Sequence, residues 1–346
     1  MIIDDTLREG LQTPGMSYTV DEKIKLSRLI ADSGIKRALV SYPSAHWSES
    51  EVTKRICSDG IFDETFGLGR TVRSDVDAIA ETGANISLHL PFQFDDTGPI
   101  LDAVKYASKK GRLLEVSVVN IAKYRTDDLM KLGKMMEAAG ADVVQFPDTT
   151  GQASPKLLGA VIREARKTLK CQISVHCHND LGGALSNALE GLHSGADFVD
   201  TCIYGLGERN GISDTASIGR LMELEGIHTE LNYEKLSKAY EEVLNLILKK
   251  IGPGLFIDNF PVHGKNTLVH TAGTHAASSG VFQGAKYSVN VYTGRSMISN
   301  ILNSHGIRLS NEKLSELTAE VKDQSVNTGL TLKVEQILKM AREKID

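Results

Sequence analysis

The sequence predicts an α/β protein in which a (β/α)8 TIM barrel is followed by a small, mainly helical C-terminal domain. Short runs rich in β-branched residues alternate with helical patterns through the first two-thirds of the chain, as expected of parallel βα units. Eight such units span roughly 220 residues, close to the length that a (β/α)8 barrel takes. A doubly wound sheet is the alternative, but no Gly-x-Gly-x-x-Gly follows the first strand.

Each of the eight expected strands leads into a helix-like segment. Val20–Asp32 follows the first strand and Thr126–Ala139 follows the fifth. Gly34, Gly140 and Gly195 stand where helices are expected to end, because glycine readily adopts the conformation that terminates a helix. The expected strands are Ile2–Leu7, Arg37–Tyr42, Thr65–Arg70, Asn85–Pro91, Leu113–Asn120, Asp142–Pro147, Cys171–His178 and Phe198–Tyr204.

The chain changes character after the strongly helical run Tyr233–Lys250. Ile251–Gly254 breaks that run, and Asp258–Pro261 is a second turn-rich stretch. We therefore expect a catalytic barrel over residues 1–250, with a linker and helical subdomain over residues 251–346. A packing extension that covers one end of the barrel fits the periodicity equally well. The later helical patterns lie at about Arg295–Ser304, Asn311–Asn327 and Thr331–Lys344.

Composition restricts the classes of partner. The 346 residues are 41% hydrophobic and 24% charged, which supports a large buried core and argues against disorder. The net charge of −5 has its signs interspersed, so we expect no nucleic acid partner and take small molecules as the default ligands. Four cysteines without paired spacing, and an opening without a signal segment, predict a cytoplasmic protein with reduced thiols. No apolar run approaches the roughly 20 residues that cross a bilayer, so no membrane partner is expected.

A His-x-His pair ends the seventh expected strand. Because side chains on a strand alternate between its faces, His176 and His178 project the same way and can close on one metal ion. Leu181–Gly183 then opens an amphipathic helix, so the pair lies at the strand end where barrels carry their active sites. A packed, hydrogen-bonded histidine pair explains the pattern as well as a metal site does. A third ligand at another strand end decides between them.

The first expected strand supplies that ligand. Arg8, Glu9 and Gln12 follow it in the loop, on the barrel face expected for the histidines. Glu9 completes a set of two histidines and one carboxylate, which suits Mg2+, Mn2+ or Zn2+ and leaves positions open for substrate. Arg8 is suited to stabilising an oxyanion beside the metal. The alternative is that Arg8 and Glu9 form a rim salt bridge, worth at most about 1 kcal/mol.

The eighth loop is rich in glycine. Gly205, Gly207 and Gly211 allow backbone amides to approach an anion just before a helix capped near Ser213 or Asp214, so a carboxylate or phosphate is one expected occupant. A merely tight turn explains the glycines too. Glu208 and Arg209 are expected to form a supporting ion pair.

Three motifs together resemble the signatures of the DRE-TIM metallolyase superfamily: Asp5–Gly10, His176–Asp180 and Gly205–Gly211. The likeness spans essentially the whole chain. Gly-Glu-Arg-Asn-Gly-Ile points toward homocitrate synthase and 2-isopropylmalate synthase rather than 3-hydroxy-3-methylglutaryl-CoA lyase, whose cysteine-bearing loop is missing. Those synthases condense an acyl-CoA with a 2-oxo acid and hydrolyse the thioester.

The resemblance implies a role for each matching residue. Glu9, His176 and His178 would bind the metal, Arg8 and Gln12 would lie beside the reacting oxygens, and Thr149 would contact the carboxylate of the oxo acid. Isopropylmalate synthases tend to have a metal-binding Asn at the position of Ile212, whereas homocitrate synthases resemble this chain in having Ile. Three protein ligands are therefore expected.

The segment Gly264–His275 resembles a family motif, Gly-Glu-Asn-Ala-Phe-Ala-His-Glu-Ser-Gly-Ile-His, whose last residue is catalytic. His275 matches that histidine. In the family this subdomain swaps across a dimer, so a domain-swapped homodimer is implied. Tyr287 is the candidate for the assisting tyrosine and Tyr292 is the reserve, with two structural tyrosines as the alternative.

The chain also departs from the synthases. Their catalytic glutamate after the fifth strand is missing from Val118–Tyr124, and the arginine that grips 2-oxoglutarate in homocitrate synthases falls near Ser117. Pro91–Gln93 replaces Gly-Thr-Ser after the fourth strand. A different oxo acid is implied, and the run from Asn120 resembles the metal-dependent 4-hydroxy-2-oxovalerate aldolases.

Three classes of function follow. The first is a metal-dependent Claisen-type condensation of an acyl-CoA, with acetyl-CoA as the expected donor, and a 2-oxo acid. The second is an aldolase or lyase that cleaves a 4-hydroxy-2-oxo acid or a hydroxyacyl-CoA at the same metal site. The third is a catalytically silent oxo-acid-binding protein, which retention of Arg8, Glu9, His176 and His178 disfavours.

Overall fold

A computed structural model describes residues 1–93, 96–271 and 286–344. Eight parallel strands close into a barrel in sequence order, with β8 pairing back onto β1, which confirms the predicted TIM barrel. The strands are β1 (Ile2–Asp4), β2 (Arg37–Ser41), β3 (Glu64–Arg70), β4 (Asn85–His89), β5 (Leu114–Ser117), β6 (Val143–Asp148), β7 (Gln172–Cys177) and β8 (Phe198–Thr201).

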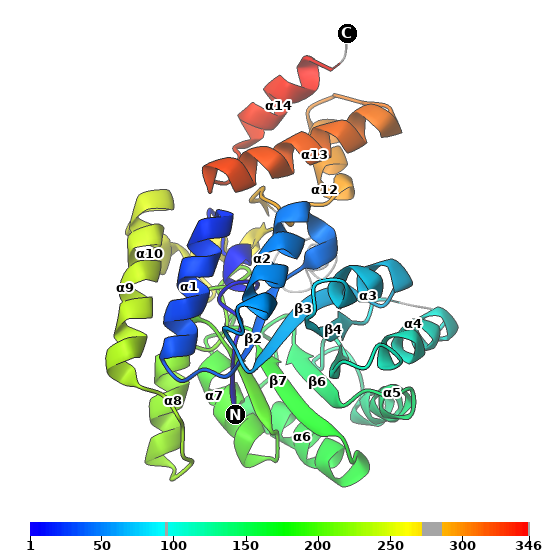
Figure 1. Cartoon of the computed structure of the whole chain (residues 1–346), viewed down its shortest axis with the longest axis vertical. Helices are drawn as coiled ribbons and strands as arrows, with labels where there is room; N and C mark the ends of the chain where they lie inside the picture. The colour runs from blue at the N-terminus through cyan, green and yellow to red at the C-terminus, as the bar shows by residue number, and fades with distance from the viewer. Residues whose placement is uncertain (94–95, 272–285, 345–346) are drawn as a thin grey trace.

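Helices surround the barrel (Figure 1). Capping residues define several of their starts: Thr19 and Glu22 form a capping box at α1, and Asp214 accepts a hydrogen bond from the Ser217 amide at α8. The helices are α1 (Val20–Asp32), α2 (Trp47–Ser58), α3 (Arg73–Ala80), α4 (Gly98–Ser108), α5 (Thr126–Ala138), α6 (Pro155–Thr168), α7 (Ala184–His193), α8 (Thr215–Leu224) and α9 (Tyr233–Lys250).

Most strands end earlier than the sequence predicted, because the residues at their carboxyl ends turn into loops that carry the site. The expected strand Ile2–Leu7 ends at Asp4. There the Asp4 carboxylate accepts hydrogen bonds from the Thr6 amide at 3.0 Å and the Thr6 hydroxyl at 2.9 Å. This local turn replaces the strand ladder and directs the following residues over the barrel mouth.

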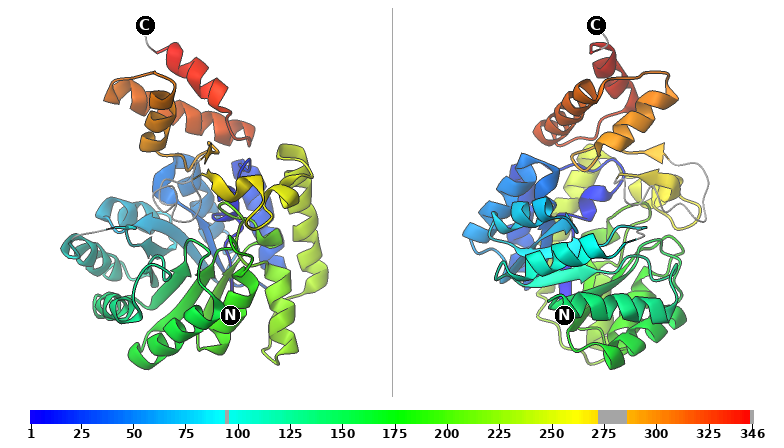
Figure 2. Two further views of the ribbon diagram at one scale, coloured as in Figure 1. Left: turned by 180° about the vertical axis from the view of Figure 1, so that it is seen from behind. Right: turned by 90° about the vertical axis from the view of Figure 1, so that its right-hand side faces the viewer.

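The C-terminal region begins with the short helix α10 (Leu255–Asp258) and the two-stranded pair β9 (Val269–His270) and β10 (Lys286–Tyr287). Three helices follow: α12 (Arg295–Ser304), α13 (Asn311–Thr328) and α14 (Val334–Arg342). They share a hydrophobic cluster separate from that of the barrel. Figures 1 and 2 show them together at the end of the molecule opposite the N-terminus. The boundary between residues 250 and 251 stays a prediction.

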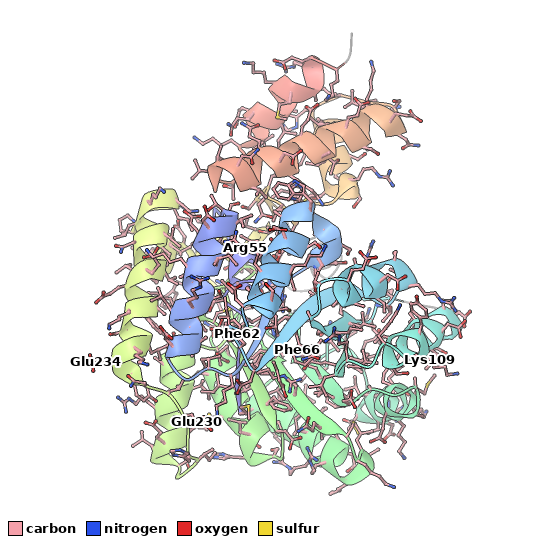
Figure 3. The ribbon with its side chains drawn as sticks, viewed as in Figure 1. Arg55, Phe62, Phe66, Lys109, Glu230 and Glu234 are labelled. Carbon is pink, nitrogen blue, oxygen red and sulfur yellow. The ribbon has the colours of Figure 1, made fainter. Side chains whose placement is uncertain are left out.

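Polar contacts join α13 to the start of α2 and to the loop before it. The Lys322 ammonium donates to the Ala45 carbonyl at 2.6 Å, and Asp323 accepts from the Trp47 indole at 3.2 Å. In Figure 3, the buried Phe66 lies on β3 and the buried Phe62 just before it, whereas the exposed Lys109 and Glu234 lie at the end of α4 and on α9. A helix able to cross a membrane is absent from the described parts of the chain.

Candidate active site and metal centre

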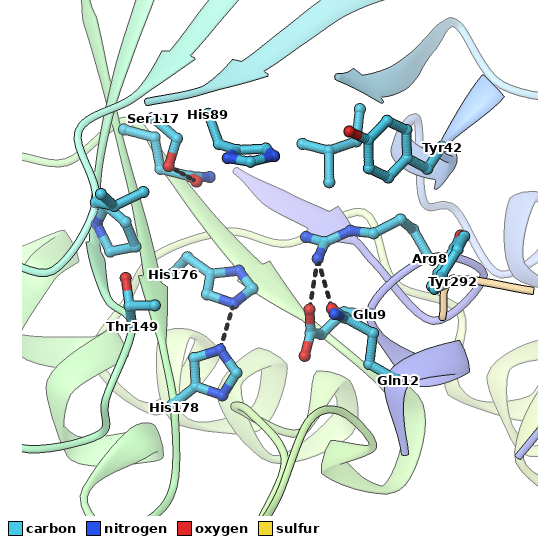
Figure 4. A pocket seen from close by; sticks show the side chains of 14 residues that line it. Arg8, Glu9, Gln12, Tyr42, His89, Ser117, Thr149, His176, His178 and Tyr292 are labelled. Atoms are coloured by element: carbon cyan, nitrogen blue, oxygen red, sulfur yellow. Dashed lines mark hydrogen bonds and ion pairs between the residues drawn. The ribbon is translucent and has the colours of Figure 1, made fainter. Parts of the chain in front are cut away.

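A pocket lies at the carboxyl ends of the barrel strands, and the space between its protein atoms, open solvent included, is about 820 Å³. Ligand sites of TIM barrels occupy this face. Figure 4 shows that the side chains in it come from loops and strands far apart in the sequence. The lining residues are Arg8, Glu9, Gln12, Tyr42, Leu68, His89, Ser117, Val119, Gln145, Pro147, Thr149, His176, His178 and Tyr292.

Glu9, His176 and His178 converge as the sequence predicted. Their possible ligand atoms lie within 4.8 Å of one another, and all three residues are buried. The Nε2 atoms of the two histidines are 3.3 Å apart. Two nitrogens bound to one metal at about 2.0–2.1 Å would be separated by about 3.0–3.4 Å. The donor set and its spacing therefore fit a divalent cation.

Asp200 on β8 fixes the orientation of His176. Its Oδ2 atom lies 2.9 Å from the Nδ1 atom of His176 and also accepts from the Gln145 amide at 2.8 Å. A neutral His176 that donates from Nδ1 to this carboxylate has its Nε2 lone pair free for a metal. Sequence reasoning missed Asp200, although a carboxylate within an apolar strand is a visible signal.

We expect Asp200→Asn to weaken metal binding by about 10–100-fold, because the amide orients the imidazole less strongly than the carboxylate does. Titration of metal-free protein, followed by calorimetry, measures the affinity. Asp197→Asn is the matched control, since Asp197 lies at the amino end of β8 and pairs with Arg166. Equal affinities of the two variants would remove Asp200 from the site.

Arg8 is held on three sides. Its Nε and Nη2 atoms donate to the two carboxylate oxygens of Asp5, and its Nη1 atom donates to Glu9 at 2.5 Å and to Gln12 at 3.0 Å. Burial opposes the charged form, but the carboxylates of Asp5 and Glu9 raise the pKa of Arg8 above its ordinary value. A permanent, fixed positive charge therefore lies beside the candidate metal ligands.

The glycine-rich loop after β8 holds the carboxylate of Glu9. The Glu208 amide donates to Glu9 Oε1 at 2.8 Å. A side chain at Gly207 would place its Cβ 2.9 Å from the same oxygen, and the Gly207 φ angle of 149° is also one that favours glycine. The anion that this loop binds is therefore the carboxylate of Glu9.

The expected Glu208–Arg209 ion pair is replaced by other partners. Arg209 forms a two-point ion pair with Asp180, at 2.6 and 2.9 Å, while Glu208 accepts from the backbone amide of Thr271. Both residues are buried, where a charge needs such partners. Glu208 and Arg209 therefore stabilise the loop, and neither of them lines the pocket.

Thr149 and Val119 form part of the opposite wall. The Thr149 hydroxyl accepts from the Asn120 amide at 2.9 Å, at a turn where Asn120 has a φ of 61°. Val119 lines the pocket on the chain after β5, where the resembling synthases carry a glutamate. Among the described lining residues Glu9 is the only carboxylate.

The three residues expected from the C-terminal segment have different positions. Tyr292 lines the pocket beside Arg8 (Figure 4). Tyr287 on β10 packs against the hydrophobic cluster of α12–α14. His275 lies outside the described residues. The reserve tyrosine, rather than the first candidate, is thus the one in the pocket.

Sequence reasoning also missed His89 and Tyr42. His89 ends β4, so the strand-end rule that found His176 would have found it. Burial lowers the pKa of His89, with its hydrogen bond to the Leu90 carbonyl opposing the shift. The ring is therefore neutral at pH 7, and donation from Nδ1 to Leu90 at 3.3 Å leaves Nε2 able to accept a proton or hydrogen bond.

The fold and the site define a class: a (β/α)8 barrel with two histidines, one carboxylate and an arginine at its mouth. The model of the HMGL-like protein family matches residues 1–92 and 97–243. The chain belongs to this family. The resemblance to the DRE-TIM metallolyase superfamily is thereby confirmed.

Two archaeal relatives are similar over most of the chain. A 2-isopropylmalate synthase of Methanocaldococcus jannaschii is 33% identical over 289 residues, which are 80% of this chain and 55% of that protein. The chain thus spans just over half of that relative. The homocitrate synthase AksA of the same organism is 32% identical over 293 residues, 79% of this chain and 70% of that protein.

Solved structures agree on the fold. The HMG-CoA lyase of Bacillus subtilis superposes with a TM-score of 0.64 at 19% identity, over 73% of this chain and 95% of that one. At this identity the likeness concerns architecture alone.

Proposed function

We propose that the protein catalyses a metal-dependent, Claisen-type condensation of an acyl-CoA, acetyl-CoA in the first instance, with a 2-oxo acid. The observation that carries this proposal is the convergence of Glu9, His176 and His178 beside the fixed guanidinium of Arg8. The synthase relatives support it, because their names describe products of such condensations.

The described residues suit the parts of this reaction. Glu9, His176 and His178 would hold a divalent cation, Mg2+, Mn2+ or Zn2+, which would polarise the carbonyl of the oxo acid as a Lewis acid. Arg8 and Gln12, held together at 3.0 Å, offer donors to the oxygen on which negative charge develops. Thr149 offers its hydroxyl to the carboxylate of the oxo acid across the pocket.

The far wall of the pocket favours an oxo acid with an uncharged side chain. Leu68, Val119 and Pro147 are apolar, and Ser117 is neutral. Among the described lining residues, Arg8 is the only permanently charged cation. Four of its five N–H donors already bond Asp5, Glu9 and Gln12, which leaves one for the developing oxyanion. A second substrate carboxylate would therefore be desolvated without a partner. This extends the expectation that 2-oxoglutarate is not the substrate.

A second candidate is the aldolase or lyase reaction at the same site. Val119 favours it, because the pocket wall after β5 lacks the carboxylate expected for removal of a proton from an acyl-CoA methyl group. Cleavage of a 4-hydroxy-2-oxo acid instead needs a base near the substrate hydroxyl, a position for which His89 is available.

A substrate panel tests the proposal. Purified protein with Mg2+, Mn2+ or Zn2+ is mixed with acetyl-CoA and a series of 2-oxo acids, and free thiol is followed. Release is expected with 2-oxo acids that have short, uncharged side chains, but not with 2-oxoglutarate. Absence of thiol release together with pyruvate formation from 4-hydroxy-2-oxo acids would replace the proposal by the aldolase reading. Glu9→Gln protein is the control for background hydrolysis.

We also propose that a domain-swapped homodimer forms and that His275, which lies outside the described residues, acts as base in the partner's barrel, with a tyrosine, Tyr287 or Tyr292, assisting. Mixed His275→Ala and His176→Ala proteins are then expected to regain a fraction of activity, because some heterodimer sites have both groups. Subunit exchange is verified by mass spectrometry. No recovery despite exchange would place the whole site within one chain.

A further inference from the structure

A buried ion pair lies behind the wall of the pocket. The Lys23 ammonium on α1 donates to both carboxylate oxygens of Glu49 on α2, at 2.7 and 2.8 Å. Lys23 is 1% exposed and Glu49 is 2% exposed. Neither residue lines the pocket, so the catalytic proposal leaves the pair without a role.

The pair reaches the pocket through two tyrosines. Glu49 Oε2 accepts from the Tyr292 hydroxyl at 2.8 Å and from the Tyr42 backbone amide at 3.2 Å. Both tyrosines line the pocket, and their ring centroids are 6.3 Å apart. In Figure 4, Tyr292 lies beside Arg8, and Tyr42 lies above Arg8. One carboxylate therefore organises this side of the pocket.

Tyr292 belongs to the C-terminal region, 243 residues from Glu49. Its segment is fixed on the loop that carries Arg8 and Gln12. The side chain of Asn290 donates to the carbonyls of Leu11 at 2.8 Å and Met16 at 3.1 Å, and the Gly15 amide donates to Ser288. Seating of this segment thus brings Tyr292 to the site, and Glu49 receives its hydroxyl.

Stability alone does not account for such a pair. Taking two charges out of water costs several kcal/mol per ion, and apolar replacements of a buried pair are often neutral or stabilising. Burial lowers the pKa of Lys23, with Glu49 opposing the shift. What the charged pair provides, and apolar residues would not, is a fixed acceptor for the hydroxyl of Tyr292.

We propose that Lys23 and Glu49 are positioning residues: they hold Tyr292 against Arg8, so that docking of segment 287–293 completes the pocket. Burial and the negative charge of Glu49 raise the pKa of Tyr292. Its hydroxyl therefore stays protonated and donates a hydrogen bond to Glu49. Tyr292 is then a fixed wall of the oxo-acid site. The effect on turnover rests on the proposed function, whereas the docking of the segment does not.

The kinetic test is a double-mutant cycle. K23M/E49M replaces the pair by apolar side chains of similar length and is expected to fold with an unchanged or higher Tm. Its kcat/KM for the oxo acid should fall about 10-fold or more, since small misplacements at a site cost up to about 100-fold. Y292F should fall similarly, and the combined variant should be no worse than Y292F. Independent, multiplying losses would overturn the proposal.

Hydrogen exchange tests the docking without any assay of activity. Amides of residues 287–293 should exchange faster in K23M/E49M and in Y292F than in the unmodified protein. The matched control is K25M/E242M, which removes another ion pair of the same helix α1, at an exposed position. Unchanged exchange in K23M/E49M would refute the proposal. Absence of condensing activity from the unmodified protein would instead refute the proposed function.

Discussion

His176→Ala protein is expected to lose tight metal binding and at least about 10³-fold in turnover. Loss of an outer hydrogen bond to a metal-binding histidine typically costs 10–100-fold in affinity, and loss of a ligand itself should cost more. A metal contributes several kcal/mol to stabilisation of developing charge, and about 4 kcal/mol corresponds to the 10³-fold decrease. The remaining pair of Glu9 and His178 would not complete the three-ligand set.

Metal content by plasma mass spectrometry, and turnover with added metal, measure this prediction. His193→Ala is the matched control, because His193 is the last residue of α7 and its side chain is 41% exposed. Equal metal content in the two variants would contradict the proposed centre. Loss of metal with full turnover would remove the metal from the reaction.

The convergence of Glu9, His176 and His178 was predictable because it follows from two regularities. Side chains two residues apart on a strand share a face, and the carboxyl ends of parallel strands meet at one end of a barrel. The structure brings all three together. The same regularities apply to His89 and Asp200. The sequence prediction missed them because each is a single polar residue on its strand and not part of a paired motif such as His-x-His.

The position of Tyr292 was not predictable in this way. It depends on where the chain between residues 250 and 290 returns to the barrel, and no periodicity encodes such a path. Contacts of Asn290 with the loop at Leu11 and Met16 decide it. Similarly, the glycine-rich loop was expected to hold an anion, but only the fold could identify Glu9 as the occupant.

Strand ends were the least accurate part of the prediction. The pattern of Ile2–Leu7 predicts one strand. In the structure the Asp4 carboxylate accepts hydrogen bonds from the Thr6 amide and hydroxyl, and the strand ends at Asp4. Hydrogen bonds of this local kind compete with the sheet for the same backbone groups. The residues that leave the strand early are those that approach the site, so the errors fall where function is expected.

Arg8→Lys is expected to lower kcat by about 10²–10³-fold while changing stability far less. The guanidinium donates to Asp5 through two nitrogens and to Glu9 and Gln12 through the third. A lysine ammonium keeps the charge but not this planar fork. One oxyanion donor typically contributes 10²–10³ in rate when it is lost. Arg8→Ala is a poorer test, because it would leave the buried Asp5 carboxylate without a cation.

Steady-state kinetics of Arg8→Lys, with Tm measured alongside, separate the two effects. Arg166→Lys is the control, since Arg166 makes a partly exposed ion pair with Asp197 away from the pocket, where an ion pair contributes only about 0–1 kcal/mol. A fall in kcat with retained metal content and Tm would assign Arg8 to the transition state. A rise in KM alone would limit Arg8 to binding substrate, and a near-normal rate would remove Arg8 from the mechanism.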